Sequence, residues 1–209
     1  MGRYTGPVCR ICRREGMKLF LKGERCYMAK CAIEVGRPVP GQHGASRRRK
    51  QSDYAVQLSE KQKLRKSYGL REGQFRVIFA RARHHRGMTG ENLLQRLELR
   101  LDNLVYRLGF APSRRAARQF VRHNHIDVNG RKVNIPSATL KAGDKVGVRS
   151  GPRSREYAKQ WMEAAAARGI VPWLTVDKDN LSGEVLRVPA RSELAPGVNE
   201  QLVVELYSK

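Results

Sequence analysis

Residues 113–130, with the sequence SRRAARQFVRHNHIDVNG, restrict the fold of this chain more than any other segment. Ser113 is a preferred residue for capping a helix, and basic and apolar side chains follow it at helical spacing. Asn129-Gly130 lies within the alternating sequence IDVNGRKVNI and predicts a type I′ hairpin turn. The expected apolar face of this hairpin consists of Ile126, Val128, Val133 and Ile135. A helix followed directly by an antiparallel hairpin indicates an α+β fold.

The segments on either side extend this unit. Apolar residues from 94 to 108 recur at steps of three and four, which predicts one continuous amphipathic helix from about residue 89 to Gly109. The members of this stripe are Leu94, Leu97, Leu101, Leu104, Val105 and Leu108. A short strand, KVGVR, is expected after the turn at residues 142–144. Two helices and a small antiparallel sheet should therefore form a compact module.

The charge of the chain is strongly positive and unevenly distributed. The formal net charge is +23, from 42 Lys and Arg against 19 Asp and Glu. Residues 151–209 carry equal numbers of each sign, so the whole excess lies in the first 150 residues. Such an excess is more than solubility requires, and it indicates a polyanionic partner. No apolar run long enough to span a membrane and no secretory leader is evident, so we expect a cytosolic protein bound to nucleic acid.

The helix after Ser113 carries most of its charge on one side. Arg114, Arg118 and Arg122 recur every four residues, with Arg115 beside them. Like charges at this spacing destabilise an isolated helix by about 0.2–0.5 kcal/mol per pair, so the reason for them should lie outside the helix. We expect this face to contact RNA phosphates. Reversing the three stacked arginines to Glu is expected to abolish RNA binding and to leave thermal unfolding nearly unchanged.

All four cysteines lie near the N-terminus, as Cys9, Cys12, Cys26 and Cys31. Two close pairs can form a tetrahedral thiolate site, and closed sites of this kind are usually structural zinc sites. The segment has too few apolar residues to fold by burial alone, so one zinc ion would supply its folding energy. An iron–sulfur cluster could use the same ligands, and His43 could replace a cysteine. A reducing cytosol disfavours disulfides.

A linker and two helices make up the rest of the basic N-terminal half. Residues 36–52 mix Gly, Pro, Ser and a basic run, which is typical of an extended linker. Ser52 can cap a helix that ends at Gly69, and a second helix is expected around Phe75 and Phe79. Two sets of basic residues in this region are expected to contact phosphates. The linker set comprises Arg47, Arg48, Arg49 and Lys50, and the helix set comprises Lys61, Lys63, Arg65 and Lys66.

The neutral C-terminal segment is expected to serve packing or protein contact. It should contain a helix over residues 154–168, two strands at PWLTV and GEVLRV, and a final strand or packed segment at QLVVELY. The sequence therefore divides into four parts. They are a zinc-binding segment at 1–45, a helical domain at 46–97, an RNA-binding module at 98–150, and a C-terminal part at 151–209 that packs back on the body.

Several stretches, in order and over nearly the whole chain, resemble the bacterial family of the fourth small-subunit ribosomal protein. They are MGRYTGPVCRICRREG, LKGERC, PGQHG, SDYAVQLSEKQKLRKSYG, RLDNLVYRLGFAPSRRAARQFVRHNHIDVNGRKVNIPS and NEQLVVELYSK. The block at 100–137 alone would indicate only a small RNA-binding module, which also occurs in pseudouridine synthases and some tRNA synthetases. Some family members lack the four cysteines, so zinc binding is a trait of a subfamily.

The resemblance implies a structural ribosomal protein in the cytoplasm, with no enzymatic activity, membrane or small-molecule substrate. Its module would present the second helix and the hairpin to ribosomal RNA, at a multi-helix junction of the 5′ domain where small-subunit assembly begins. The linker set would line the messenger RNA entrance. Further implied roles are contact with the fifth small-subunit protein, an influence on decoding accuracy, and repression of its own operon. The matching RNA-binding residues of the module are Arg114, Arg115, Arg118, Arg122, His123, Asn129, Gly130 and Lys132.

Two other functions remain to be weighed against this one. The tripeptide Arg100-Leu101-Asp102 resembles the catalytic motif of pseudouridine synthases, but it is expected inside a continuous helix and lacks the turn that follows the aspartate there. We expect Asp102 to pair with a neighbour such as Arg100 or Arg107. A zinc-dependent DNA-binding regulator is the third possibility, although no recognition helix with base-reading side chains follows the cysteines.

Overall fold

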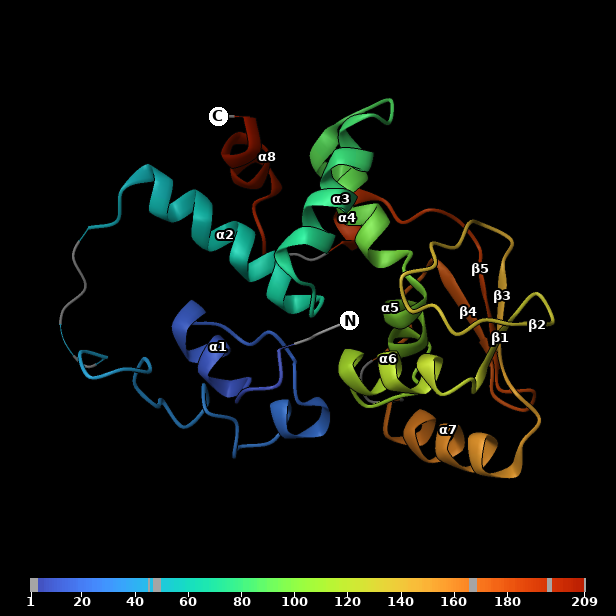
Figure 1. Cartoon of the computed structure of the whole chain (residues 1–209). Helices are drawn as coiled ribbons and strands as arrows, with labels where there is room; N and C mark the ends of the chain where they lie inside the picture. The colour runs from blue at the N-terminus through green and yellow to red at the C-terminus, as the bar shows by residue number, and fades with distance from the viewer. Residues whose placement is uncertain (1–3, 45, 47–49, 166–168, 195–196, 209) are drawn as a thin grey trace. The chain divides into compact units, whose positions relative to one another are not determined.

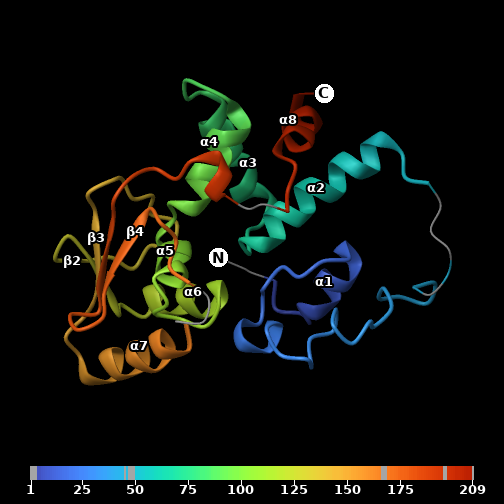
Figure 2. The ribbon, with the colours of Figure 1, turned by 180° about the vertical axis from the view of Figure 1, so that it is seen from behind.

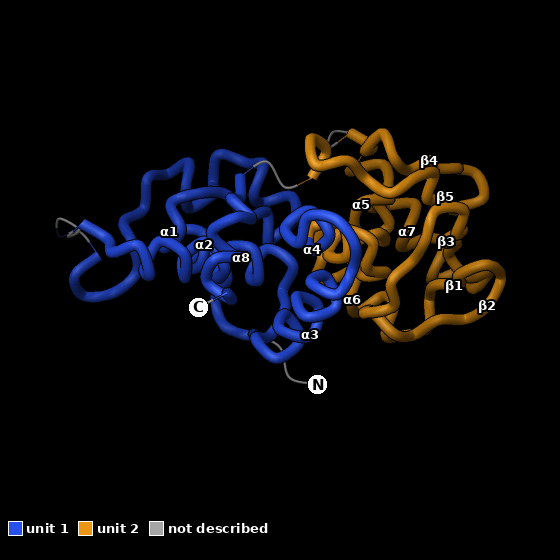
Figure 3. The backbone as a smooth tube through the Cα atoms, turned by 90° about the horizontal axis from the view of Figure 1, so that it is seen from above, with its two compact units in different colours: residues 1–93, 197–209 blue, residues 94–196 orange. Residues whose placement is uncertain are grey.

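The computed structural model describes residues 4–44, 46, 50–165, 169–194 and 197–208. They form two compact units (Figure 3), one from residues 1–93 and 197–209 and the other from residues 94–196. The neutral segment expected to begin at residue 151 is thus shared between them. Its first part completes the unit that contains the hairpin, and its last helix joins the N-terminal unit.

The second unit is built on a five-stranded antiparallel sheet in the order β2-β1-β3-β5-β4. The strands are β1 (Ile126–Val128), β2 (Arg131–Lys132), β3 (Lys145–Val148), β4 (Leu174–Asp177) and β5 (Ser182–Val185). Figures 1 and 2 show α5 (Leu101–Arg107) and α6 (Arg114–Arg122) side by side next to this sheet. The predicted α+β architecture is confirmed, and both expected C-terminal strands are present.

The hairpin turn has the predicted conformation. Asn129 and Gly130 have φ values of 50° and 76°, and positive φ at both central residues is what a type I′ turn requires. The turn joins Val128 to Arg131 in register. The placement of Ile135 on the apolar face was wrong, because β2 ends at Lys132 and the Ile135 side chain is 57% exposed.

The expected continuous helix from residue 89 is interrupted at residue 100. It consists of α4 (Thr89–Glu98) and α5, and Arg100 between them has an extended backbone. The reason is tertiary, since residues 136–140 pair with the break. The Leu101 N–H donates to the Ala138 carbonyl at 2.8 Å, and the Leu140 N–H donates to the Leu99 carbonyl at 2.9 Å. The leucine stripe continues through this break, so its spacing gave no sign of it.

One hydrophobic core fills the second unit. Phe110, Val121, Ile126 and Val146 are buried where α5 and α6 meet the sheet. Further core residues come from α7 (Pro152–Ala165), which contributes Ala158 and Met162, and from the end of the segment before β4, which contributes Trp173. A short 3₁₀ turn, η3 (Arg191–Glu193), follows β5. Burial of these side chains fixes the apolar side of α6 and therefore decides which of its residues reach the surface.

The N-terminal unit is helical. It contains α1 (Cys9–Glu15), the 3₁₀ turn η1 (Gly23–Cys26), α2 (Asp53–Ser67), α3 (Glu72–Arg83) and α8 (Glu200–Ser208), together with the first half of α4. The Ser52 hydroxyl caps α2 by accepting from the Ala55 N–H at 3.4 Å, as predicted. Figures 1 and 2 show α8 next to α2. Among the described helices, none is long and apolar enough to cross a membrane.

The last apolar run packs against the body, as expected, but it is a helix and not a strand. The Asn199 side chain accepts the Gln201 N–H at 3.0 Å at the start of α8. The Val203 side chain is fully buried, and the Tyr207 ring packs against Phe75 and Phe79 of α3. These contacts use helical spacing, whereas a strand would need a partner strand in a unit that contains none in its described part.

Candidate nucleic-acid interface

Helix α6 is held so that one side faces the core and the other faces solvent. The Ser113 hydroxyl accepts the Ala116 N–H at 3.3 Å and caps the helix. Ala117, Phe120 and Val121 are buried beneath it. Arg115 and Arg122 are exposed, and neither has a hydrogen-bond or ion-pair partner within the described part of the chain. These two side chains are placed to meet an external anion.

Arg118 is turned toward the protein and not toward solvent. Its Nη1 donates to Asp102 Oδ2 at 3.0 Å, and its side chain is 14% exposed. Arg100 binds the same carboxylate through two hydrogen bonds of 3.1 and 2.8 Å. Asp102 therefore pairs with Arg100, as predicted, but its second partner is Arg118 and not Arg107.

Arg114 is braced in the same way. Its Nε donates to Asn103 Oδ1 at 2.7 Å, and its guanidinium lies 4.9 Å from the centre of the Tyr106 ring. Asn103 in turn donates to Glu98 Oε2 at 2.6 Å, and Arg107 binds the Glu98 carboxylate at 2.7 and 3.0 Å. The Glu98 side chain is buried. Through it and Asn103, a chain of polar contacts joins α4, α5 and α6.

Two members of the predicted stack, Arg114 and Arg118, thus already have polar partners within the protein, and RNA contact by all three stays a prediction. Arg114 and Arg118 support the fold, and only Arg122 of the three is exposed. The expectation that replacing all three arginines by Glu would leave stability nearly unchanged assumed that none of them has a structural partner. Breaking a buried ion pair by removing one partner costs about 3–5 kcal/mol, so we expect the triple reversal to destabilise the module as well as to weaken any binding.

The hairpin tip combines structural and exposed residues. Asn129 donates to Asp144 at 2.8 Å and accepts the Lys145 N–H at 2.9 Å, so its side chain fixes the turn. Gly130, Lys132 and His123 are exposed, as a binding role requires. Arg131, next to Lys132, is exposed too and was missed, although the hairpin register already placed it at the tip.

His125 follows the C-terminal end of α6 in the sequence and is partly buried. Its ring stacks on Phe120 with centroids 4.7 Å apart, and Nδ1 lies 2.8 Å from the Ser154 hydroxyl. Burial lowers the pKa of His125, and the charges of His123 and Arg149 lower it further. His125 therefore acts as a neutral packing residue near neutral pH and is not part of the cationic surface.

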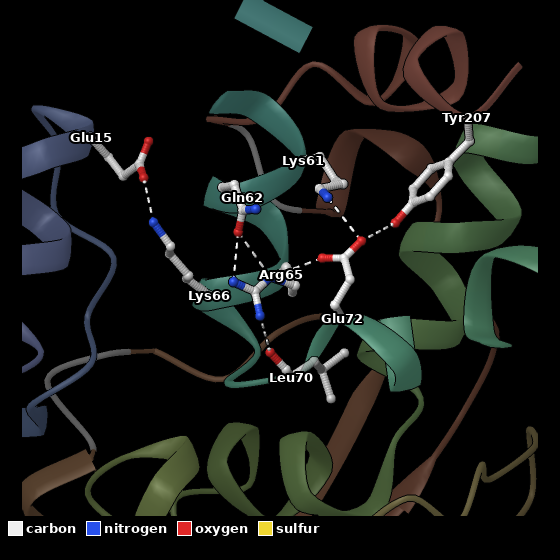
Figure 4. A network of polar contacts seen from close by, with 8 residues as sticks. All are labelled: Glu15, Lys61, Gln62, Arg65, Lys66, Leu70, Glu72 and Tyr207. Atoms are coloured by element: carbon white, nitrogen blue, oxygen red, sulfur yellow. Dashed lines mark hydrogen bonds and ion pairs between the residues drawn. The ribbon is translucent and has the colours of Figure 1, made fainter. Parts of the chain in front are cut away.

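The four basic residues of α2 do not form a free cationic face, and three of them, Lys61, Arg65 and Lys66, are drawn with their partners in Figure 4. Lys61 binds Glu72 at 2.8 Å, and Lys66 binds Glu15 at 3.0 Å. Arg65 donates to Gln62 and to the Leu70 carbonyl, and it lies 3.5 Å from Glu72. Lys63 pairs with Glu60. Each of these cations is used to join α2 to itself or to a neighbouring element, which the helical spacing alone did not reveal.

A group of exposed arginines lies on and around α3. It comprises Arg71, Arg76, Arg81, Arg83 and Arg86, and none of them was predicted. The buried side of α3 carries Phe75, Phe79 and Ala82, so the apolar spacing of the sequence could have identified the opposite, cationic side. Of the linker set, Lys50 is exposed, whereas Arg47, Arg48 and Arg49 lie outside the described residues.

The four cysteines all belong to the N-terminal unit. Cys12, Cys26 and Cys31 are buried, Cys9 is half-buried, and all are free thiols. Burial raises the pKa of Cys12, a hydrogen bond from the Leu19 backbone opposes this, and the charges of the other three thiols raise it again. In the described part of the chain no three His, Cys, Asp or Glu side chains converge closely enough to hold a metal ion. Four cysteine thiolates are a donor set whose chemistry suits zinc.

Comparison with known proteins assigns most of the chain to two family models. A model described as the ribosomal protein S4/S9 N-terminal domain matches residues 3–98, and a model described as the S4 domain matches residues 99–146. The second match covers α5, α6 and the hairpin. Small ribosomal subunit protein uS4 of Thermus thermophilus is 56% identical to this chain over 209 residues, 100% of both chains. The corresponding figures are 57% for uS4A of Symbiobacterium thermophilum and 56% for uS4 of Geobacter metallireducens, again over the full length of both.

Proposed function

The chain belongs to the uS4 family of small ribosomal subunit proteins, and from this membership we infer that it is a structural, ribosomal RNA-binding component of that subunit, located in the cytoplasm within the ribosome. The observation that carries this inference is the 56% sequence identity to a uS4 relative over the full length of both chains. The S4 domain model also matches residues 99–146, which include α6 and the hairpin. The net charge of +23 agrees with a polyanionic partner.

The geometry in and around α6 indicates that some arginines stabilise the fold and that others are placed to bind RNA. Arg100, Arg107, Arg114 and Arg118 surround two buried carboxylates, Glu98 and Asp102, which leaves an excess of two positive charges. These contacts hold α6 rigidly, so Arg115 and Arg122 project from a fixed base. Rigid cations can stabilise one compact arrangement of RNA strands through their phosphates, without reading base edges.

The finer roles rest on the family resemblance. We propose that the protein binds a multi-helix junction in the 5′ domain of the ribosomal RNA and starts small-subunit assembly there. Arg47 to Lys50 would line the messenger RNA entrance, and the protein would contact the fifth small-subunit protein, influence decoding accuracy and in some conditions repress its own operon. The exposed Lys50 agrees with the entrance role.

The RNA-binding proposal is tested by replacing the outward arginines only. The double variant Arg115→Gln, Arg122→Gln should bind a small-subunit ribosomal RNA transcript more weakly, and the slope of log affinity against log salt should fall by about 2 because two phosphate contacts are lost. Arg153→Gln, at an exposed arginine of α7, serves as the matched control. An unchanged slope for the double variant would contradict the assignment.

We further propose that Cys9, Cys12, Cys26 and Cys31 hold one structural zinc ion. Zinc would supply the tetrahedral centre around which this segment, poor in core residues, is ordered. Elemental analysis of the purified protein should give one zinc per chain, and Cys26→Ser should lower that content. One iron atom or more per chain, with the visible absorption of a cluster, would support the iron–sulfur alternative instead.

No catalytic role is proposed. Asp102, the residue that matches the pseudouridine synthase motif, is 5% exposed and is engaged by two arginines, so it is poorly placed to reach a base. An assay for uridine isomerisation in the bound transcript should be negative. A competition experiment with duplex DNA distinguishes RNA binding from the DNA-binding alternative. A ribosomal protein should keep its bound RNA when duplex DNA is added.

A further inference from the structure

The four-cysteine segment presents an aromatic surface that the proposed interface on α6 does not use. Tyr27 is 53% exposed and Met28 is 51% exposed, whereas Leu19 and Cys26 are buried. The Phe20 ring packs against Tyr27, with ring centroids 5.2 Å apart and planes tilted by 32°. A pair of rings therefore lies at the surface of a segment that has little core of its own.

The backbone holds these rings in place. Phe20 has a φ of 51°, a left-handed conformation that is uncommon outside glycine and is often found at functional sites. On the other side, the Tyr27 N–H donates to the Glu24 carbonyl at 2.8 Å, and the Lys22 N–H donates to Cys26 Sγ at 3.4 Å. The ring surface is thus formed before any partner binds, which lowers the entropy cost of binding.

The charges around the rings favour nucleic acid over protein as the partner. Lys22, Arg25 and Lys30 are exposed and lie within five residues of Tyr27 in the sequence. Residues 4–44 contain eight Lys and Arg but only three Glu. The centres of protein–protein interfaces are depleted of lysine, whereas proteins that bind single-stranded RNA combine aromatic faces with a cationic surrounding.

We propose that Tyr27, supported by Phe20, is a stacking platform for an unpaired nucleobase of the ribosomal RNA, with Arg25 and Lys30 at the phosphates next to that base. The proposal rests on the proposed function and adds a second contact in the other unit of the protein. Because every base has a π-face, the platform would select an unpaired nucleotide and not a particular base.

The test compares full-length variants in binding to a small-subunit ribosomal RNA transcript at several salt concentrations. Tyr27→Leu should weaken binding by about 5- to 100-fold without changing the salt slope, because it removes a stacked base and no phosphate contact. Tyr27→Phe keeps the ring and should bind like the wild type. Tyr54→Leu replaces a tyrosine that is 57% exposed on α2 and should have no effect. Arg25→Gln should lower the slope by about 1.

Four outcomes would overturn the proposal. Tyr27→Leu could bind as well as Tyr54→Leu, or it could lose thermal stability or zinc content along with affinity, which would make the ring structural. It could also bind the transcript normally but fail to enter reconstituted small subunits, which would assign the surface to a neighbouring protein. A wild-type protein that does not bind the transcript would contradict the proposed function itself, and this proposal with it.

Discussion

Asp102 shows how the burial of one side chain decides the roles of its neighbours. In the sequence, Arg118 is one of several arginines on a basic helix and looks like an RNA ligand. In the structure, the buried Asp102 carboxylate binds both Arg118 and Arg100, and these two side chains are 14% and 3% exposed. An arginine that satisfies a buried carboxylate contributes to stability, and its charge is only partly available to a phosphate.

Removing that carboxylate charge should destabilise the second unit. Asp102→Asn leaves Arg100 and Arg118 without a counter-charge in a buried site, so the free energy of unfolding should fall by about 3–5 kcal/mol. Urea unfolding followed by circular dichroism measures this. Glu184→Gln, which removes an exposed partner of Lys145, is the control and should cost less than about 1 kcal/mol. Equal losses in the two variants would show that the Asp102 cluster adds little.

Gly183 is a second residue whose identity is set by its neighbours. A Cβ at this position would lie against the Leu108 side chain and 2.7 Å from the Thr175 carbonyl oxygen, which belongs to the adjacent strand. Gly147 in β3 has no atom within 4 Å of the same position. The two glycines look alike in the sequence, but only one is required by packing.

The difference between these glycines is measurable. Gly183→Ala should destabilise the protein by about 1–3 kcal/mol, because the backbone of β4 must move to admit the methyl group. Gly147→Ala should be nearly neutral or slightly stabilising, because it only restricts the unfolded chain. Thermal unfolding of both variants against the wild type tests this pair, and a neutral Gly183→Ala would mean that the sheet adapts freely.

At the scale of elements, the C-terminal helix α8 joins the N-terminal unit through a shared carboxylate. Glu72 at the start of α3 accepts from Lys61 of α2 at 2.8 Å and from the Tyr207 hydroxyl of α8 at 2.9 Å (Figure 4). Burial alone would raise the pKa of Glu72, but the hydrogen bonds from Lys61 and Tyr207 and the charges of Lys61 and Arg65 outweigh it, so the pKa is lowered. One ionised group thus joins the neighbouring helices α2 and α3 to α8, which lies far from them in the sequence.

This arrangement predicts an acid dependence of stability. A carboxylate whose pKa is lower in the folded state contributes stability that is complete above its ordinary pKa and is lost as the pH falls through the lowered value. Wild-type unfolding free energy should therefore drop between about pH 5 and pH 3, and Glu72→Gln should remove part of this drop. Tyr207→Phe, which keeps the ring, should show a smaller change. A Glu72→Gln profile parallel to the wild type would contradict the role of this group.

Elements differ in how well their sequence predicted them. The helix after Ser52, the helix after Ser113 and the Asn129-Gly130 hairpin were predicted because their caps and turn are local. The break at Arg100 and the helical state of α8 were missed, because each depends on a partner that is distant in the sequence. The partner is the segment at 136–140 in the first case and α2 and α3 in the second.

At the scale of the whole molecule, the two proposed RNA contacts belong to different compact units, and the proposed zinc lies in only one of those units. If zinc orders the cysteine segment, a strong chelator should increase amide hydrogen exchange in residues 4–44 and leave residues 94–196 protected. Mass spectrometry of exchanged peptides measures both regions in one sample. Cys26→Ser should give the same pattern without chelator, and equal loss of protection in both units would contradict a local role for the metal.

The sequence by itself determined the α+β class, the helix and hairpin of the module, the cationic character and the family, because caps, turns and net charge depend on residues that are close together in the chain. Tertiary structure alone decided which basic residues remain exposed. A guanidinium reaches solvent or a carboxylate according to what the fold brings beside it. The fold places Glu98, Asp102 and Glu72 beside Arg114, Arg118 and Lys61, which the sequence had assigned to RNA.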